Sequence, residues 1–165
     1  MKIMDADSIQ LHVPTSEDGL PLHRLIQQCP PLDPNSVYCN LLHCSHFAST
    51  SVAAKQGGEL VGFISGYVIP ERPDTLFIWQ VAVAESARGR GLASQMLTHL
   101  LQRPACSDVR FMETTITPDN QGSWALFRRF AESRQAPLKE SVEFDRDRHF
   151  SGQHDSEWLV RIGPL

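Results

Sequence analysis

The chain has 165 residues, of which 41% are hydrophobic and 21% charged, and its formal net charge is −4. This size and composition fit one globular domain, and we expect a single domain over residues 1–165. The net negative charge, without a basic stripe or an arginine-rich arm, argues against nucleic acid as a partner. No apolar run is long enough to span a membrane, and residues 1–7 lack the pattern of a signal peptide, so we expect a cytoplasmic protein.

The cysteine pattern gives little support to a metal site. The four cysteines are Cys29, Cys39, Cys44 and Cys106. In a reducing compartment they are expected as buried or partly buried thiols. His43 and His46 lie near two of them, but the spacing matches no zinc module and no second ligand pair follows. We therefore predict no metal.

The first half of the chain predicts two helices between strands. Alternation over residues 8–14 indicates a half-buried strand, and residues 15–18 begin a helix that ends before Pro30. A second helix is expected to open within residues 32–36. Strands at 51–55, 60–69 and 75–83 follow, joined by turns at 56–59 and 70–74. These three strands predict an antiparallel meander.

The second half returns to alternating helices and strands. A glycine-containing loop precedes a helix over about 92–102, whose predicted buried stripe is Leu92, Met96, Leu97, Leu100 and Leu101. Further elements are expected at 109–115 (strand), 123–132 (helix), 141–144 (strand) and 157–162 (strand), with a polar loop at 145–156. The predicted fold class is α+β, with a central mixed, mostly antiparallel sheet flanked by helices.

The loop Arg88-Gly-Arg-Gly-Leu-Ala93 lies between a strand and a helix. Glycine lets backbone N–H groups approach a ligand, and a helix N-terminus adds unpaired donors and a partial positive charge. The loop therefore predicts an anion site suited to phosphates. It matches neither a dinucleotide fingerprint nor a Walker loop. The alternative is a tight turn that needs glycine for its backbone alone.

Arg88, Gly91 and Ala93 fit the pattern Arg/Gln-x-x-Gly-x-Gly/Ala, and here the sequence resembles the GNAT superfamily of acetyl-CoA-dependent N-acetyltransferases. The resemblance implies that backbone groups from Arg88 to Ala93 hold the coenzyme A pyrophosphate. It also implies that main-chain groups of Val81 and Val83 contact the pantetheine arm. The implied loop residues are Arg88, Gly89, Arg90, Gly91, Leu92 and Ala93.

A second segment carries the same resemblance. Asn120, Ser123, Leu126 and Phe127 fit a later Asn-x-x-Ala/Ser-x-x-Leu-Tyr/Phe pattern of the superfamily. The resemblance implies that this segment contacts the pantetheine or the emerging thiol. Many members have a tyrosine where this chain has Phe127, so another group supplies the proton or the thiolate leaves unaided. Asn120 also fits a helix cap, and Phe127 a core aromatic.

Four further blocks, at residues 32–47, 77–83, 112–121 and 152–157, are similar to the diaminobutyrate acetyltransferases of ectoine biosynthesis. The similarity covers almost the whole chain from about Leu11. It implies a homodimeric cytoplasmic enzyme that moves the acetyl group of acetyl-CoA to the γ-amino group of L-2,4-diaminobutyrate.

That substrate carries two ammonium groups and one carboxylate, so its site needs acidic or carbonyl partners. Asp33 and Glu157 are the predicted carboxylates, with Trp79 as an apolar wall in cation–π range. A neutral amine is the nucleophile, and therefore a base is required. Glu157 and His154 are its candidates, and Tyr38 is the candidate acid or orienting hydroxyl. Each of these residues also has an ordinary role open to it, as a cap, a core ring or a solvated loop residue.

Three other interpretations stay open from the sequence. The enzyme could proceed through an acyl-cysteine at Cys39 or Cys44, although neither has an evident base, and direct transfer is favoured. The acceptor could be another small diamine, an amino acid or a peptide N-terminus. A coenzyme A-binding module without catalysis is the third, which the clustered polar residues at 33, 38, 79, 154 and 157 disfavour.

Overall fold

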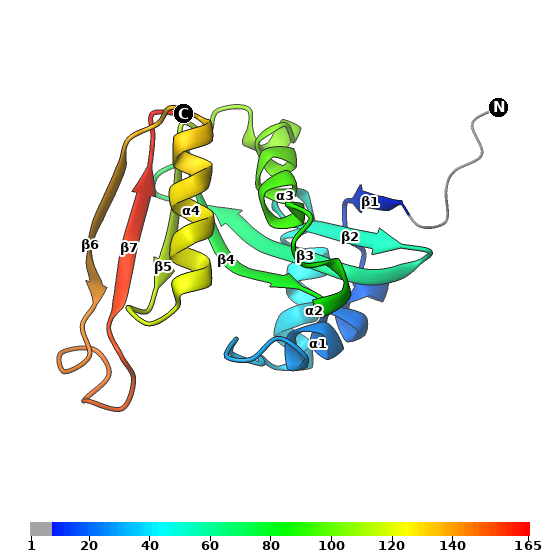
Figure 1. Ribbon diagram of the computed structural model, residues 1–165, viewed down its shortest axis with the longest axis horizontal. Coiled ribbons are helices and arrows are strands. Elements are labelled where there is room, and N and C mark those ends of the chain that lie inside the picture. Colours follow the sequence, from blue (N-terminus) through cyan, green and yellow to red (C-terminus); the bar gives the residue numbers. More distant parts are fainter. Residues whose placement is uncertain (1–7) are drawn as a thin grey trace. The chain divides into compact units, whose positions relative to one another are not determined.

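The computed structural model describes residues 8–165, so the prediction for residues 1–7 lies outside the described part of the chain. The strands are β1 (Ile9–His12), β2 (Val52–Gln56), β3 (Glu59–Val68), β4 (Thr75–Val83), β5 (Phe111–Ile116), β6 (Leu138–Phe144) and β7 (Glu157–Ile162). The helices are α1 (Gly19–Gln27), α2 (Val37–Ser45), α3 (Leu92–Leu101) and α4 (Gln121–Ser133), with short 3-10 turns between elements (Figure 1).

The strands form a mixed sheet in the order β1-β2-β3-β4-β5-β7-β6. Strands β4 and β5 run parallel, with Ile78 opposite Thr114, whereas the β1–β2, β2–β3, β5–β7 and β6–β7 pairs are antiparallel. The predicted α+β class with a mostly antiparallel mixed sheet is confirmed, as is the β2–β3 hairpin, where Gln56 pairs with Glu59 across the turn.

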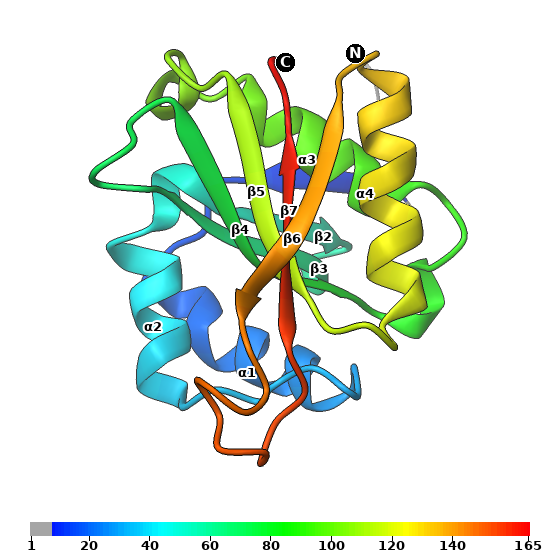
Figure 2. The same cartoon turned by 90° about the vertical axis from the view of Figure 1, so that its left-hand side faces the viewer.

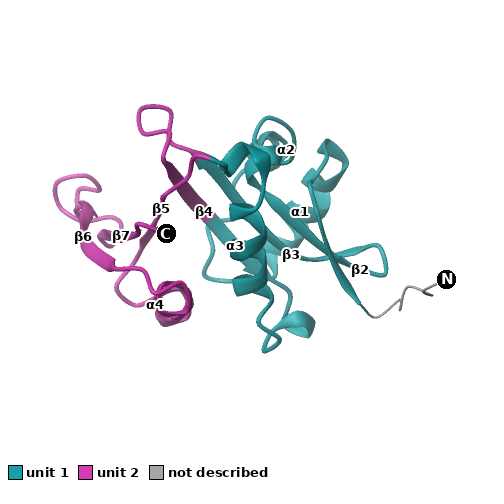
Figure 3. Cartoon of the chain, turned by 90° about the horizontal axis from the view of Figure 1, so that it is seen from above, with its two compact units in different colours: residues 1–67, 80–107 teal, residues 68–79, 108–165 magenta. Residues whose placement is uncertain are grey.

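The chain divides into two compact units (Figure 3). Unit 1 contains the chain up to residue 67 and residues 80–107, and unit 2 contains residues 68–79 and 108–165. Strand β4 passes from unit 2 to unit 1 after Trp79.

Unit 1 is built on α1, α2 and α3. Leu22, Leu25 and Ile26 of α1 share a buried cluster with Cys44, Ala53, Phe63 and Ala82. Helix α3 lies close over β3 because Gly62 has no side chain: a Cβ there would stand 3.0 Å from Leu92 and 3.2 Å from Met96. The predicted α3 stripe is buried at Leu92, Met96, Leu97 and Leu100, and Leu101 is half-buried.

Unit 2 places α4 against the strands β5, β7 and β6 (Figure 2). Its core holds Phe127 and Phe130 from α4, with Met112, Val160 and Ile162 from the strands. The core strand residues alternate along β5 and β7, as expected for a sheet with one covered face.

Several boundaries differ from the predictions by one to four residues, and those of β6 and α4 have a local cause. Strand β6 begins at Leu138, three residues before the predicted 141. The prediction missed this start because residues 139–144 are exposed and show no alternation in burial. Helix α4 begins at Gln121 because Asn120 is its N-cap, and its side chain accepts from the Ser123 N–H at 3.2 Å. In residues 8–165, no helix is long and apolar enough to cross a membrane.

Candidate active site

Within residues 8–165, no side chain caps the first N–H groups of α3, which follows the loop 88–91. Gly89 and Gly91 have φ of 76° and 72°, in the left-handed region where a side chain is strained. Gly91 is the N-cap of α3 and has no side chain to occupy the first N–H groups of the helix. Backbone donors of this kind, together with the helix dipole, attract anions.

The arginine side chains of this loop turn back onto the protein. The Arg88 Nε donates to the Val83 carbonyl at 3.1 Å, and Arg90 donates to the Ser86 carbonyl at 3.1 Å. Both contacts fix the loop at its strand end. The Val83 carbonyl therefore already has a hydrogen-bond partner. The strand groups left to consider for a pantetheine arm are the N–H of Val83 and the main chain of Val81.

The second predicted coenzyme segment lies in unit 2. Asn120 caps α4 and Ser123 supplies the capped N–H, so the cap interpretation of Asn120 holds in the structure. Phe127 is 2% exposed and belongs to the core of its unit. It has no proton to donate, so the acid that protonates the departing thiolate is another group or water.

Asp33 lies in a tight turn of unit 1 before α2. Its side chain is exposed, and Oδ1 accepts from the Asn35 N–H at 3.2 Å. Among the described residues, Oδ2 has no hydrogen-bond partner. The carboxylate is thus held by one oxygen and offers the other to a cation. Tyr38, on the first turn of α2, is 70% exposed.

Glu157 begins β7 in unit 2, and its side chain is 23% exposed. Burial raises the pKa of Glu157, and neighbouring Asp155 adds to the rise. His154 and a hydrogen bond from the Thr115 hydroxyl oppose it without cancelling it. A carboxyl with a raised pKa is suited to accept a proton near neutral pH.

His154 stands beside this carboxylate. Its Nδ1 is 2.6 Å from the Asp155 carbonyl oxygen, so Nδ1 carries the proton of the neutral ring. The other nitrogen, Nε2, then faces Glu157 Oε1 at 4.0 Å as an acceptor. At this spacing, one N–H group or one water can donate to both His154 Nε2 and Glu157 Oε1.

Trp79 is 44% exposed, unlike the buried Ile78 before it. Ile78 pairs with Thr114, so Trp79 lies at the level of Thr115 along the unit 2 sheet. Thr115, His154 and Glu157 therefore lie together in unit 2, and Trp79 stands at the level of Thr115 on the neighbouring strand. Asp33, Tyr38, Val81, Val83 and the loop 88–93 belong to the other unit.

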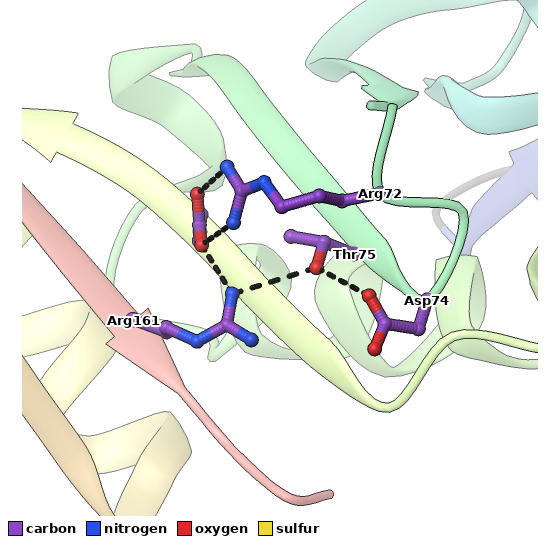
Figure 4. Close-up of polar contacts among 5 residues, drawn as sticks. Arg72, Asp74, Thr75 and Arg161 are labelled. Carbon is purple, nitrogen blue, oxygen red and sulfur yellow. Dashed lines mark hydrogen bonds and ion pairs between the residues drawn. The ribbon is translucent and has the colours of Figure 1, made fainter. Parts of the chain in front are cut away.

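A second carboxylate of unit 2, Glu113, has a different environment, because it is bound by Arg72 and Arg161, which Figure 4 labels. It is 2% exposed and accepts from Arg72 at 2.6 and 2.8 Å and from Arg161. Burial would raise the pKa of Glu113, but the hydrogen bonds and charges of the two guanidinium groups prevail and lower it. Glu113 is therefore charged at neutral pH and holds the two arginines in place.

The thiols of α2 are poorly suited to an acyl-enzyme. Cys39 Sγ is 3.5 Å from His43 Nε2, a partner that sequence reasoning missed. Burial and the charge of Asp33 nevertheless raise the pKa of the Cys39 thiol, and burial raises that of Cys44 to about 12. Both stay protonated at neutral pH, which favours direct transfer. Within the described ranges, no three side chains of metal-binding type gather at one point.

Sequence reasoning also missed Thr115 and Gln80. Thr115 pairs with Leu159, two residues from Glu157, a diagonal contact that only the β5–β7 register reveals. Gln80 donates to the Asp33 carbonyl from 47 residues away. Neither has a local sequence signal beyond its place in a strand.

Comparison with known proteins agrees with this geometry. Residues 20–131 match the model of the acetyltransferase (GNAT) family. The chain belongs to the GNAT family of acetyltransferases. It is 59% identical over 157 residues to L-2,4-diaminobutyric acid acetyltransferase from Methylotuvimicrobium alcaliphilum, covering 95% of this chain and 91% of that protein.

Solved structures of this family extend the comparison. The diaminobutyrate acetyltransferase of Paenibacillus lautus, in complex with its substrate L-2,4-diaminobutyric acid and coenzyme A, matches with a TM-score of 0.91 at 40% identity. The match covers 96% of each chain. A GNAT acetyltransferase from Desulfovibrio desulfuricans, 16% identical with a TM-score of 0.70 over 96% of this chain and 99% of its own, shares the GNAT fold.

Proposed function

We infer that this GNAT enzyme transfers the acetyl group of acetyl-CoA to L-2,4-diaminobutyrate, at the γ-amino group. The similarity over nearly full length to the Paenibacillus lautus enzyme, whose complex contains diaminobutyric acid and coenzyme A, carries this conclusion. The open donors before α3 fit the pyrophosphate of coenzyme A, and the two carboxylates Asp33 and Glu157 fit the two ammonium groups of the acceptor.

We propose that Glu157 is the general base and His154 its helper. The amine arrives as an ammonium and must lose a proton before it attacks the thioester carbonyl. The raised pKa of Glu157 and the acceptor Nε2 of His154 suit this transfer, directly or through one water. The proposed binding residues are Asp33 and Trp79 for diaminobutyrate. Tyr38 is the proposed acid or orienting hydroxyl, and main-chain N–H groups of 79–83 would polarise the carbonyl.

We further propose that the two units act as one catalytic domain in a homodimer located in the cytoplasm. The four cysteines are free thiols, which suits a reducing compartment. Light scattering on the purified protein tests the dimer: twice the monomer mass supports it and a monomer mass contradicts it.

One assay tests the function. Thiol release from acetyl-CoA is followed with diaminobutyrate, ornithine, lysine, polyamines and short peptides, and the acetylated position is identified by NMR. We expect the highest kcat/KM for diaminobutyrate, with acetylation at the γ-amino group. Activity on a peptide without activity on diaminobutyrate would overturn the assignment.

A further inference from the structure

A chain of side-chain amides joins the Asp33 turn to strand β4 within unit 1. Gln80 of β4 makes two of its contacts: Nε2 donates to the Asp33 carbonyl at 2.8 Å, and Oε1 accepts from Asn35 Nδ2 at 2.9 Å. Gln80 therefore holds the turn at two residues. Its own N–H donates to the Ser65 hydroxyl of β3 at 3.2 Å, which anchors the strand end of the connection.

The chain continues from Asn35 into the interior. Asn35 Nδ2 also donates to Asn40 Oδ1 at 3.4 Å, and Asn40 Nδ2 lies 3.1 Å from His23 Nδ1 of α1. Asn40 is 0% exposed. A buried amide that loses a partner is left unsatisfied at substantial cost, so this arrangement favours one conformation of the turn.

The backbone of the turn needs that support. Asn35 has φ of 54°, in the left-handed region that non-glycine residues rarely occupy, although asparagine tolerates it better than most. In this conformation its N–H reaches Asp33 Oδ1. The contacts of Gln80 and Asn35 thus determine where the free oxygen of the Asp33 carboxylate lies.

We propose that Gln80 and Asn35 are positioning residues that preset the Asp33 carboxylate for an ammonium group of the acceptor. This inference rests on the proposed function. Neither residue needs to touch the acceptor: each acts through Asp33. A carboxylate fixed in advance binds a cation without losing side-chain freedom on binding, and its fixed place discriminates between diamines of different length.

The test compares Gln80→Met and Asn35→Gly with Gln102→Met, an exposed glutamine at the end of α3 that makes no contact with the turn. Gln80→Met keeps the approximate shape and removes both amide contacts. Asn35→Gly keeps the backbone conformation, which glycine accepts readily, and removes only the side chain. Asn35→Gly therefore tests the inference even where Gln80→Met folds poorly.

We expect each variant to raise the KM for diaminobutyrate about tenfold, the loss of about one charge-assisted contact. The KM for acetyl-CoA should stay within twofold, and the preference for diaminobutyrate over ornithine should fall. The KM of the double variant for diaminobutyrate should be at most about twice that of the single variant with the higher KM, because both substitutions break the same connection. Gln102→Met should match the wild type throughout.

Two results would overturn the inference. One is a folded Gln80→Met or Asn35→Gly enzyme with an unchanged KM for diaminobutyrate and an unchanged preference over ornithine. The other is an equal rise in both KM values, which indicates general loosening of unit 1. A wild-type enzyme that does not acetylate diaminobutyrate would instead overturn the proposed function, and the inference with it.

Discussion

Glu113 and Glu157 lie on neighbouring strands of one unit, yet their surroundings give them opposite properties. Glu113 is the more buried, and its pKa is lowered because two guanidinium groups bind it. Glu157 is less buried, yet burial raises its pKa because a hydroxyl and a histidine 4.0 Å away oppose the rise without cancelling it. Burial alone therefore does not decide whether a carboxyl can exchange protons. The number and charge of its partners decide it.

The Glu157→Gln substitution tests the difference between the two glutamates most directly. Removal of the proposed base should lower kcat about 100-fold or more. The variant should be as stable as the wild type or more so, because the raised pKa means that the carboxylate at pH 7 costs folding energy that an amide does not. Steady-state kinetics and thermal unfolding measure the two effects.

Glu132→Gln, at an exposed position near the end of α4, is the matched control and should change neither property. A Glu157→Gln enzyme within threefold of the wild-type kcat would remove Glu157 from the role of base.

Glu113→Ala should give the reverse result. It leaves two arginines without their carboxylate, and breaking a buried ion pair costs about 3–5 kcal/mol. We expect about 3 kcal/mol, because Arg72 is half-exposed and can turn to water. Urea unfolding measures the loss of stability. A change below about 1 kcal/mol would show that Glu113 is not a structural anchor.

Acid pH should separate the two carboxylates in the wild type. The lowered pKa of Glu113 gives stability that is present above the ordinary glutamate value of about 4.3 and is lost as pH falls toward its folded pKa. Because the pKa of Glu157 is raised, activity should begin to fall on acidification while the pH is still above the ordinary glutamate value. On acidification, kcat/KM should therefore fall while circular dichroism is unchanged; coincident loss of activity and structure would contradict this order.

Thr115→Val should give the smallest effect. The Thr115 hydroxyl donates to Glu157 and lowers its pKa, so its removal should move the acid limb of the pH profile of kcat/KM to higher pH. The kcat at the pH optimum should stay within a few-fold. Thr98→Val, at an exposed position of α3, should leave the limb in place. A limb that moves to lower pH would show that Thr115 does not donate to Glu157.

Much of the fold could be predicted because periodicity is a local property. Strands β4 and β7 have the predicted bounds, since they are rich in apolar residues and turn or loop residues precede them. The loop before α3 was predictable for the same reason, because its two glycines and the helix start are adjacent in sequence. The early start of β6 was missed because an exposed strand lacks the burial pattern on which the prediction relies.

The different surroundings of the two glutamates could not be predicted. The arginines that bind Glu113 are 41 and 48 residues away, and no spacing rule joins them to it. Thr115 reaches Glu157 only through the register of β5 and β7. The contacts of Gln80 with the Asp33 turn are hidden in the same way. Chemistry that depends on strand pairing thus appears only in the fold.

The exposed strand β6 has a consequence for solubility. It stands last in the strand order, and a free edge of seven residues is a template for pairing with other chains. Val142 and Phe144 would favour such pairing, and Lys139, Glu140 and Glu143 place charges along the same edge. Such charges oppose edge-to-edge pairing, so replacing them with apolar residues should lower solubility independently of the reaction that the enzyme performs.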